Sequence, residues 1–394
     1  MSHFPAIVKL LAWMKLLVLK ILVWKFSILW PWRRRLKRVL IIEPFHLGDI
    51  LTLLSPIQNL CDYYHDRGYE ISILIPPAAQ PLVEACPLFD HALGYHILRG
   101  DFTFKKKYEL YCKLYNDRYE IVVNPFFSPD KIFSFISTIA VLCRPAFSYA
   151  MINNTVVPMQ MTPLEQYLYM DRWRKRYTTF LEDHSHSFFK YIHDLCENVC
   201  GMSFPLTLYS RGFGELPKMS LPSAYYVIVP GAGTRRPWPM KRMAELITRI
   251  HQRWPELMPV LTGGKSEQKL GDEIRQQLPD GLQVIDMIGG STLLELAAIV
   301  KGARFVVSND TGTAHLAPLF NTKSVVISGA WHIGWFHPNP LYVNTRCILH
   351  PKDCAGCGWT PCPYATDGLD LCIAEITVDE VMAEIERSEI RNNP

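Results

Sequence analysis

The residues of this chain that could carry chemistry lie in short polar turns, each at the end of an apolar run. One turn follows the run at 304–308 and consists of Asp310, Thr311, Gly312 and Thr313. A helix-like pattern comes next, with His315 in its first turn. Such residues cap helices and turn corners, but the free N–H groups of a helix N-terminus also bind phosphate. From the residues alone both interpretations stay open, and His315 is either a phosphate donor or a structural histidine.

A second turn combines glycines with positive charge. It follows the apolar run at 224–230, and its candidate ligand-binding residues are Gly231, Gly233, Thr234, Arg236 and Lys241. Glycines let the backbone approach a ligand closely, and guanidinium groups hold phosphate oxygens in pairs. The turn lacks the GK[ST] ending of a Walker A loop and the GxGxxG pattern of dinucleotide-binding domains. It indicates a diphosphate site or a basic surface turn, and it disfavours a nucleotide-dependent dehydrogenase.

Two further turns carry carboxylates. Asp49 follows Gly48 at the start of a helix-like pattern, where it is either an N-cap or a base that takes a proton from an attacking hydroxyl. Glu267 follows Gly263 and Gly264, which end another apolar run. Each turn therefore places an acidic side chain beside a backbone that a ligand can approach.

The cysteines divide into scattered residues and one group. The chain has 11 in all, and its N-terminus does not have the pattern of a secretory signal peptide, so we expect a reducing compartment. Four follow the spacing C-x2-C-x4-C-x9-C, and these are Cys354, Cys357, Cys362 and Cys372. Four thiolates so close could bind structural zinc or an iron–sulfur cluster, or they could be free or disulfide-bonded thiols.

Apolar runs and helix-like patterns alternate along most of the chain, which predicts parallel sheets with helices on both faces. We expect strands at 38–44, 70–77, 119–125, 224–230, 258–264, 282–289, 304–310 and 323–329. We expect helices at 45–68, 79–86, 130–143, 240–254, 266–278, 291–303 and 313–320, and more helix within 160–200. The predicted fold class is α/β, with two Rossmann-like doubly wound domains.

A segment rich in Gly, Pro and Ser interrupts this alternation. We expect an N-terminal domain at 38–210, a linker at 211–223 and a C-terminal domain at 224–394. Ligands in doubly wound sheets bind at the carboxyl ends of the strands, where the polar turns fall. Two domains whose carboxyl ends face each other would enclose a cleft.

Residues 1–37 form a hydrophobic segment that ends in basic residues. The segment is long enough to span a bilayer, but it is interrupted by Lys9, Lys15, Lys20 and Lys25. A central lysine costs about 2.5–3.5 kcal/mol, which offsets several apolar residues that contribute about 0.3–0.6 kcal/mol each. We expect a helix that lies in the membrane interface, with residues 33–38 beside anionic lipid. A spanning helix, or a helix docked on the protein itself or on a partner, is the alternative.

Length and charge set wider limits. The 394 residues are enough for two domains, and 49% hydrophobic with 20% charged residues is ordinary for a globular protein. The net charge of +4 implies no strong field for nucleic acid, so nucleic acid is not an expected partner.

Together these motifs resemble glycosyltransferase family 9, the bacterial heptosyltransferases of lipopolysaccharide core assembly. The resemblance runs from about residue 38 to the C-terminus. It is carried by RVLIIEPFHLGDILTLLSPIQNL, VPGAGTRRPWPMKRMAELI, LTGGKSE, IGGSTLLELAAIVKGARFVVSNDTGTAHLAPLF and VVISGAWHIGWFHP, in that order. It implies the GT-B fold, in which the first domain faces the acceptor and the second binds the nucleotide sugar.

The resemblance also implies a role for each turn. Asp49 would be the general base. Glu267 would approach the nucleotide ribose, and the block from Asp310 to His315 would approach the phosphates and sugar of the donor. Arg236, which stands where the family usually has Lys, would stabilise the departing diphosphate together with Lys241.

We therefore expect an inverting glycosyltransferase that moves a heptose from ADP-heptose to a hydroxyl of a membrane-linked lipopolysaccharide or other surface glycan. These motifs contain no acidic DxD pair suited to Mg²⁺, so no metal or other cofactor is expected to be required. The expected partners are the donor, the lipid-linked acceptor and a membrane surface, at the cytoplasmic face of the bacterial inner membrane. The alternative is a catalytically silent nucleotide-sugar-binding scaffold of a cell-envelope complex.

Overall fold

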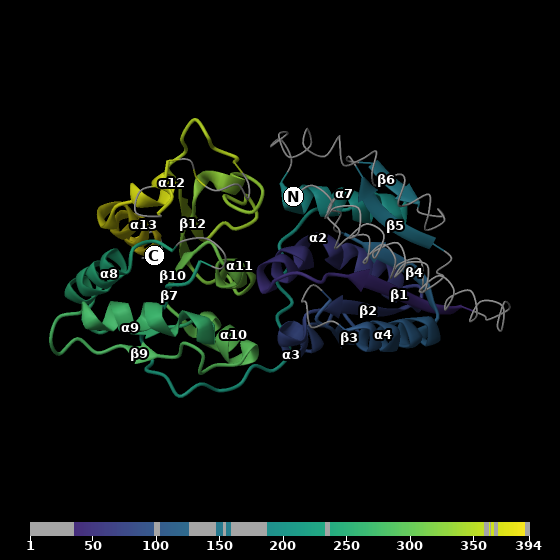
Figure 1. The fold of residues 1–394 in the computed structure, drawn as a ribbon, viewed down its shortest axis with the longest axis horizontal. Coiled ribbons are helices and arrows are strands. Elements are labelled where there is room, and N and C mark those ends of the chain that lie inside the picture. Colours follow the sequence, from purple (N-terminus) through teal and green to yellow (C-terminus); the bar gives the residue numbers. More distant parts are fainter. Residues whose placement is uncertain are drawn as a thin grey trace, which may run out of the picture.

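The computed structural model describes residues 35–97, 103–125, 147–152, 155–158, 187–232, 237–357, 362, 364–365 and 369–390. Within these residues the chain forms two α/β halves, each built on a six-stranded sheet (Figure 1). The predicted membrane-associating segment, up to residue 34, lies outside the described residues, as do the predicted helix at 130–143 and residues 160–186. Among the described residues, no helix combines the length and the apolar character needed to cross a membrane.

The first half is a sheet of order β3-β2-β1-β4-β5-β6. Its strands are β1 (Leu36–Ile42), β2 (Glu70–Ile75), β3 (His91–Gly94), β4 (Tyr119–Asn124), β5 (Phe147–Ile152) and β6 (Thr155–Pro158). Its helices are α2 (Leu47–His65), η1 (Pro77–Ala79), α3 (Gln80–Glu84), α4 (Phe104–Asp117) and α7 (Phe188–Cys200). All strand pairs are parallel except β5 with β6. Residues 39–42 of the central strand are fully buried, as expected where helices cover both faces.

The second half is a sheet of order β12-β11-β10-β7-β8-β9, and every pair in it is parallel. Its strands are β7 (Tyr225–Val229), β8 (Met258–Leu261), β9 (Ile285–Asp286), β10 (Val306–Asn309), β11 (Ser324–Ile327) and β12 (Thr345–Ile348). Its helices are α8 (Met240–Arg253), η2 (Lys265–Glu267), α9 (Gln268–Gln276), α10 (Leu293–Gly302), α11 (Gly312–Leu319), η3 (Ala330–His332), α12 (Leu371–Ala374) and α13 (Val378–Ile390).

The two halves meet through α2 and α11, which lie side by side between the sheets (Figure 1). The predicted linker at 211–223 contains no helix or strand. It is nevertheless packed: Phe213 is buried, and its ring lies 5.9 Å from the ring of Tyr209 and 5.8 Å from that of Phe320 in the second half. Aromatic packing therefore holds the linker against both halves.

The strand predicted at 282–289 is much shorter in the structure, where β9 covers only Ile285–Asp286. The Asp286 carboxylate accepts a hydrogen bond from the Ile288 backbone N–H at 3.0 Å. The chain still runs beside β8, because the Met287 backbone N–H donates to the Leu261 carbonyl at 2.9 Å. Gly289 then takes a positive φ of 66°. The apolar run predicted a longer strand. The regular strand ends at Asp286, where the side chain bonds the backbone locally, although the Gly289 N–H still donates to the Gly263 carbonyl at 2.9 Å.

Candidate functional site

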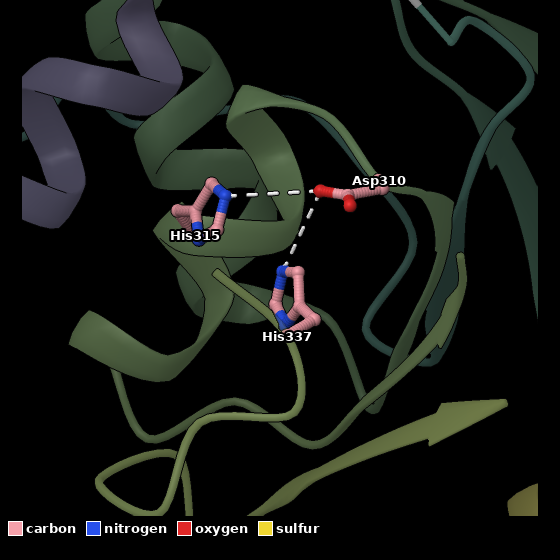
Figure 2. A group of neighbouring side chains, drawn as sticks. All are labelled: Asp310, His315 and His337. Carbon is pink, nitrogen blue, oxygen red and sulfur yellow. Dashed lines mark ion pairs between the residues drawn. The ribbon is translucent and has the colours of Figure 1, made fainter. Parts of the chain in front are cut away.

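The turn after β10 forms the centre of a compact polar cluster (Figure 2). The Asp310 backbone N–H donates to the Ile327 carbonyl at 3.2 Å, and the Ser328 hydroxyl donates to Asp310 Oδ2 at 2.9 Å. The other carboxylate oxygen, Oδ1, lies 3.9 Å from His315 Nε2 and 3.8 Å from His337 Nε2. One carboxylate oxygen is therefore fixed by a hydroxyl, while the other faces two imidazoles.

Both imidazoles are buried. His315 and His337 stack with ring centroids 4.6 Å apart and an interplanar angle of 10°. Burial, and then the neighbouring His337, lowers the pKa of His315 well below its usual value, and burial also lowers the pKa of His337. The second ring nitrogen of His315, Nδ1, lies 3.4 Å from the Tyr342 hydroxyl. His315 thus faces Asp310 and Tyr342, and its predicted role as a phosphate donor stays a prediction.

Thr311 is the N-terminal capping residue of α11, but its side chain makes no capping hydrogen bond to the helix. Its hydroxyl lies 3.2 Å from the Ser308 hydroxyl instead. Thr313, in the first turn, is buried. The first amides of this helix therefore have no side-chain acceptor from Thr311, which leaves the positive end of the helix dipole for a ligand.

The N-terminus of α2 lies against the N-terminus of α11. A β-carbon added to Gly312 would lie 3.3 Å from the Gly48 backbone nitrogen and 3.2 Å from the Leu47 side chain. A β-carbon added to Gly48 would lie 3.4 Å from the His315 ring. The first turns of the two helices, which come from different halves, are therefore in close contact at Gly48 and Gly312, and Asp49 is the next residue.

Asp49 sits in the first turn of α2 and accepts a hydrogen bond from the His46 backbone N–H at 3.0 Å. The local capping role is therefore present, but it does not exclude a catalytic one. Burial raises the pKa of Asp49 from its usual value, although the hydrogen bond from His46 opposes this. A carboxylate with a raised pKa is a stronger base, which suits proton abstraction from a hydroxyl.

Glu43, which sequence patterns did not single out, is fully buried beside this turn. Its Oε1 accepts a hydrogen bond from the Phe45 backbone N–H at 3.2 Å, and its Oε2 has no hydrogen-bond partner. Burial, and then the charge of Asp49, raises the pKa of Glu43 well above its usual value. The negative charge of Asp49 thus favours the protonated form of Glu43.

Along the same sheet edge, the ends of β7 and β8 bring Gly231 and Glu267 together. A β-carbon on Gly231 would overlap the Glu267 carboxylate, which also accepts the Gly264 backbone N–H at 2.7 Å. Asn309 ties this loop to β10, because its side chain donates to the Pro230 carbonyl at 2.9 Å and accepts the Trp238 backbone N–H at 3.1 Å. The turns after β10, β7 and β8 thus form one continuous edge, as predicted from the alternation of elements.

Not every predicted residue can be placed. Gly233, Thr234 and Arg236 lie outside the described residues. Lys241 is exposed in the first turn of α8, and within the described ranges it has no hydrogen bond or ion pair with the other predicted residues. The roles of these four residues at a diphosphate stay predictions.

The four C-terminal cysteines line one cavity together with Trp331 and Lys352. None of the four is joined in a disulfide, and the Ala330 backbone N–H donates to Cys372 Sγ at 3.4 Å. Within the described part of the chain, no three of their sulfurs lie within 4.8 Å of one another. The donor types and the shared cavity fit a thiolate-bound metal ion, and binding would draw the sulfurs closer together.

Sequence reasoning missed His337 and Glu43. The signal for His337 was weak, because it stands alone before Pro338 in an aromatic stretch far from Asp310 in sequence. The signal for Glu43 was an acidic residue directly after a strand that is otherwise buried. In both cases the fold, and not the local pattern, makes the residue a neighbour of the site.

Solved structures with the same arrangement of two sheets show the fold. "Structure of E. coli ADP-heptose lps heptosyltransferase II" matches 91% of this chain and 100% of its own, with 17% identity and a TM-score of 0.62. The iron-containing dodecameric glycosyltransferase TibC of enterotoxigenic E. coli matches 90% of this chain and 76% of its own, with 12% identity and a TM-score of 0.51. The fold is therefore that of the GT-B glycosyltransferases.

Sequence relatives narrow the class. Residues 197–365 match the family model described as glycosyltransferase family 9 (heptosyltransferase). Lipooligosaccharide heptosyltransferase 2 of Haemophilus ducreyi is 21% identical over 297 residues, which are 74% of this chain and 82% of the relative. These matches confirm that the chain resembles glycosyltransferase family 9, with the family model matched over residues 197–365.

Proposed function

We propose that this chain transfers a heptose from ADP-heptose to a hydroxyl of a lipopolysaccharide-like acceptor, with inversion at the anomeric carbon. The family match and the described activities of the Haemophilus and E. coli proteins support the donor. The observation in this chain that carries the proposal is the meeting of the two helix N-termini at Gly48 and Gly312. It brings a candidate base from one half beside an anion-binding helix end from the other.

Asp49 performs the proton transfer in this scheme. Its carboxylate takes the proton of the acceptor hydroxyl while the hydroxyl oxygen forms a bond to the anomeric carbon of the sugar. The bond from that carbon to the diphosphate oxygen breaks on the opposite face, and ADP leaves with the bonding electrons. The raised pKa of Asp49 makes the carboxylate a better proton acceptor at neutral pH.

The second half stabilises the departing ADP. The N-terminus of α11 directs its dipole toward the developing negative charge, and Arg236 and Lys241 add cationic side chains. Glu267 accepts hydrogen bonds from the ribose hydroxyls. The absence of side chains at Gly231 and Gly263 leaves the space that the Glu267 carboxylate occupies. These interactions need no metal ion for the transfer itself.

The acceptor is lipid-linked in this proposal, and the basic hydrophobic segment at 1–37 holds the enzyme at the membrane surface. Its place is the cytoplasmic face of the bacterial inner membrane, as a peripheral or monotopic protein. The composition of the segment supports this location. Its apolar residues can enter the membrane interface, and its basic residues are attracted to anionic lipid.

The test is turnover by the full chain with ADP-heptose and a panel of truncated lipopolysaccharides, measured as ADP release and as mass gain of the acceptor. We expect one heptose to be added, with inverted configuration by NMR. Asp49→Asn should lower turnover by about 10²- to 10⁴-fold and still bind ADP. Asp66→Asn, at the exposed C-terminal cap of the same helix, is the matched control. Nucleotide binding without turnover by the unaltered chain on any acceptor would favour the silent scaffold.

TibC, described as iron-containing, raises the question of a metal at the cysteine cavity. In this chain Cys354, Cys357, Cys362 and Cys372 would hold such an ion. Thiolate-bound iron or zinc would crosslink the 354–372 segment to η3 through the neighbourhood of Ala330. No step of the transfer passes through it.

A further inference from the structure

We propose that Asp310, His315 and His337 form a binding site for a divalent first-row transition-metal ion. The three side chains come from the end of β10, from α11 and from the segment that follows η3, and they converge on one point (Figure 2). Each offers one ligand atom, and the three atoms lie within 4.8 Å of one another. Two histidines and one carboxylate are a recurring protein ligand set for such ions, and they leave coordination positions open.

His337 is the residue that most requires a partner. Its side chain is 1% exposed, and neither ring nitrogen has a hydrogen-bond partner. An unsatisfied buried polar group is destabilising, so native structures rarely keep one without a ligand, ion or water. Its Nε2 faces Asp310 Oδ1 at 3.8 Å, which is too long for a hydrogen bond but suits two ligands of one ion.

The other two ligands are already oriented by outer partners. Ser328 donates to Asp310 Oδ2, which leaves Oδ1 as the inward-facing oxygen. Tyr342 contacts His315 Nδ1, so Nε2 is the nitrogen that faces the cluster. Hydrogen bonds of this kind, on the atoms that do not bind the ion, hold the ligands of known metal sites in position.

The charge pattern favours a cation over an anion. An anion at the point of convergence would meet the Asp310 carboxylate, whereas a cation would be attracted by it. Metal binding also requires neutral imidazoles, and the buried surroundings of both histidines favour the neutral form. Ligand bonds of about 2.0–2.2 Å in a tetrahedral site bring neighbouring ligand atoms to about 3.4 Å. The observed 3.8 and 3.9 Å would therefore contract by about half an ångström.

Access is from the Asp310 side, because its side chain is 14% exposed while those of His315 and His337 are 5% and 1% exposed. The ion would fix the segment that carries His337 to the turn that opens α11. The site shares Asp310 and His315 with the expected donor-binding turn, but metal binding is measured without nucleotide, so its failure and the failure of the transfer reaction are distinguishable.

The test uses the full chain, stripped with a chelator and titrated with Co²⁺ while visible d–d absorption is recorded. Cys354→Ser/Cys357→Ser/Cys362→Ser/Cys372→Ser serves as the background, so that thiolate charge-transfer bands cannot be confused with the site. We expect one Co²⁺ per chain, with nitrogen and oxygen ligation, displaced by Zn²⁺. His337→Phe keeps an aromatic ring for packing and removes both nitrogens, and it should weaken binding by about 100-fold or more.

His332→Phe, in the preceding η3, is the matched control and should bind Co²⁺ as the background chain does. Circular dichroism establishes that each variant is folded. If His337→Phe does not fold, His337→Gln is used instead, and it should weaken Co²⁺ binding by the same factor. The absence of d–d absorption in the folded background chain, or Co²⁺ affinity unchanged in a folded His337 variant, would overturn the proposal.

Discussion

Gly48 and Gly312 lie in direct backbone contact between the two halves of the molecule: a β-carbon on Gly312 would stand 3.3 Å from the Gly48 nitrogen. The contact joins the first turn of α2 to the first turn of α11. It therefore fixes the position of Asp49 relative to the turn at Asp310, and the proposed chemistry depends on that position.

Gly312→Ala should consequently impair activity more than folding. The added methyl group requires the two helix ends to separate by a few tenths of an ångström, because one of its neighbours is backbone. We expect turnover to fall by about 10- to 100-fold, since small displacements of a base are costly. Thermal unfolding and steady-state kinetics measure the two effects. Gly290→Ala is the control, because its new β-carbon would meet nothing nearer than 3.8 Å.

The assignment of Asp49 as the base predicts how the rate of the reaction depends on pH. Only the ionised carboxylate can accept a proton, and burial raises its pKa. As pH falls through that raised pKa, kcat/KM should decline, with an acid limb above the 3.8 of an ordinary aspartate. Asp49→Asn should lose about 10²- to 10⁴-fold in kcat at every pH. A pH profile of kcat/KM that stays flat down to pH 3.8 would contradict the assignment of Asp49 as the base.

The raised pKa of Glu43 predicts that its contribution to stability falls as pH rises, which is opposite to the effect of most carboxylates. Its folded-state pKa is raised, so the native state holds the proton more tightly than the unfolded chain does. The contribution of Glu43 to the free energy of unfolding is complete below pH 4.5, and it is lost as pH rises through the folded-state pKa. Glu43→Gln mimics the protonated form and should remove this loss, so the difference in unfolding free energy between Glu43→Gln and the unaltered chain should grow with pH.

Chemical denaturation at a series of pH values measures that difference. The exposed Glu84→Gln, in the neighbouring helix α3, is the control and should follow the unaltered chain. A difference for Glu43→Gln that does not change with pH would show that Glu43 is ionised in the folded protein.

Much of the architecture follows from local patterns. The buried strands before each polar turn were predicted because β-branched runs and helix-like patterns alternate. In the structure, the turns at Asp49, Glu267 and Asp310 follow strands β1, β8 and β10, respectively. Other elements were missed for physical reasons. Strand β3, for example, is the short run His91–Gly94 at the sheet edge, where burial is partial and the apolar pattern is weak.

The site was harder to predict than the fold, because its residues are brought together by tertiary contacts. The separate turns could be found from glycine and acidic residues, but nothing in the sequence indicates that Gly48 touches Gly312. His337 likewise becomes a neighbour of Asp310 only when the segment after η3 folds over α11. Arg236 had a recognisable motif, yet it lies outside the described residues, so its role stays a prediction.

The central claim is that the second half binds an adenosine diphosphate sugar. The most direct measurement is calorimetry of the full chain with ADP, UDP, GDP and CMP, beside Glu267→Ala and the exposed control Glu273→Ala. We predict selective ADP binding that weakens at least about tenfold in Glu267→Ala, from lost ribose hydrogen bonds, and is unchanged in Glu273→Ala. Selective binding of UDP or GDP would contradict the heptose donor, and no binding by the folded chain would contradict the donor site.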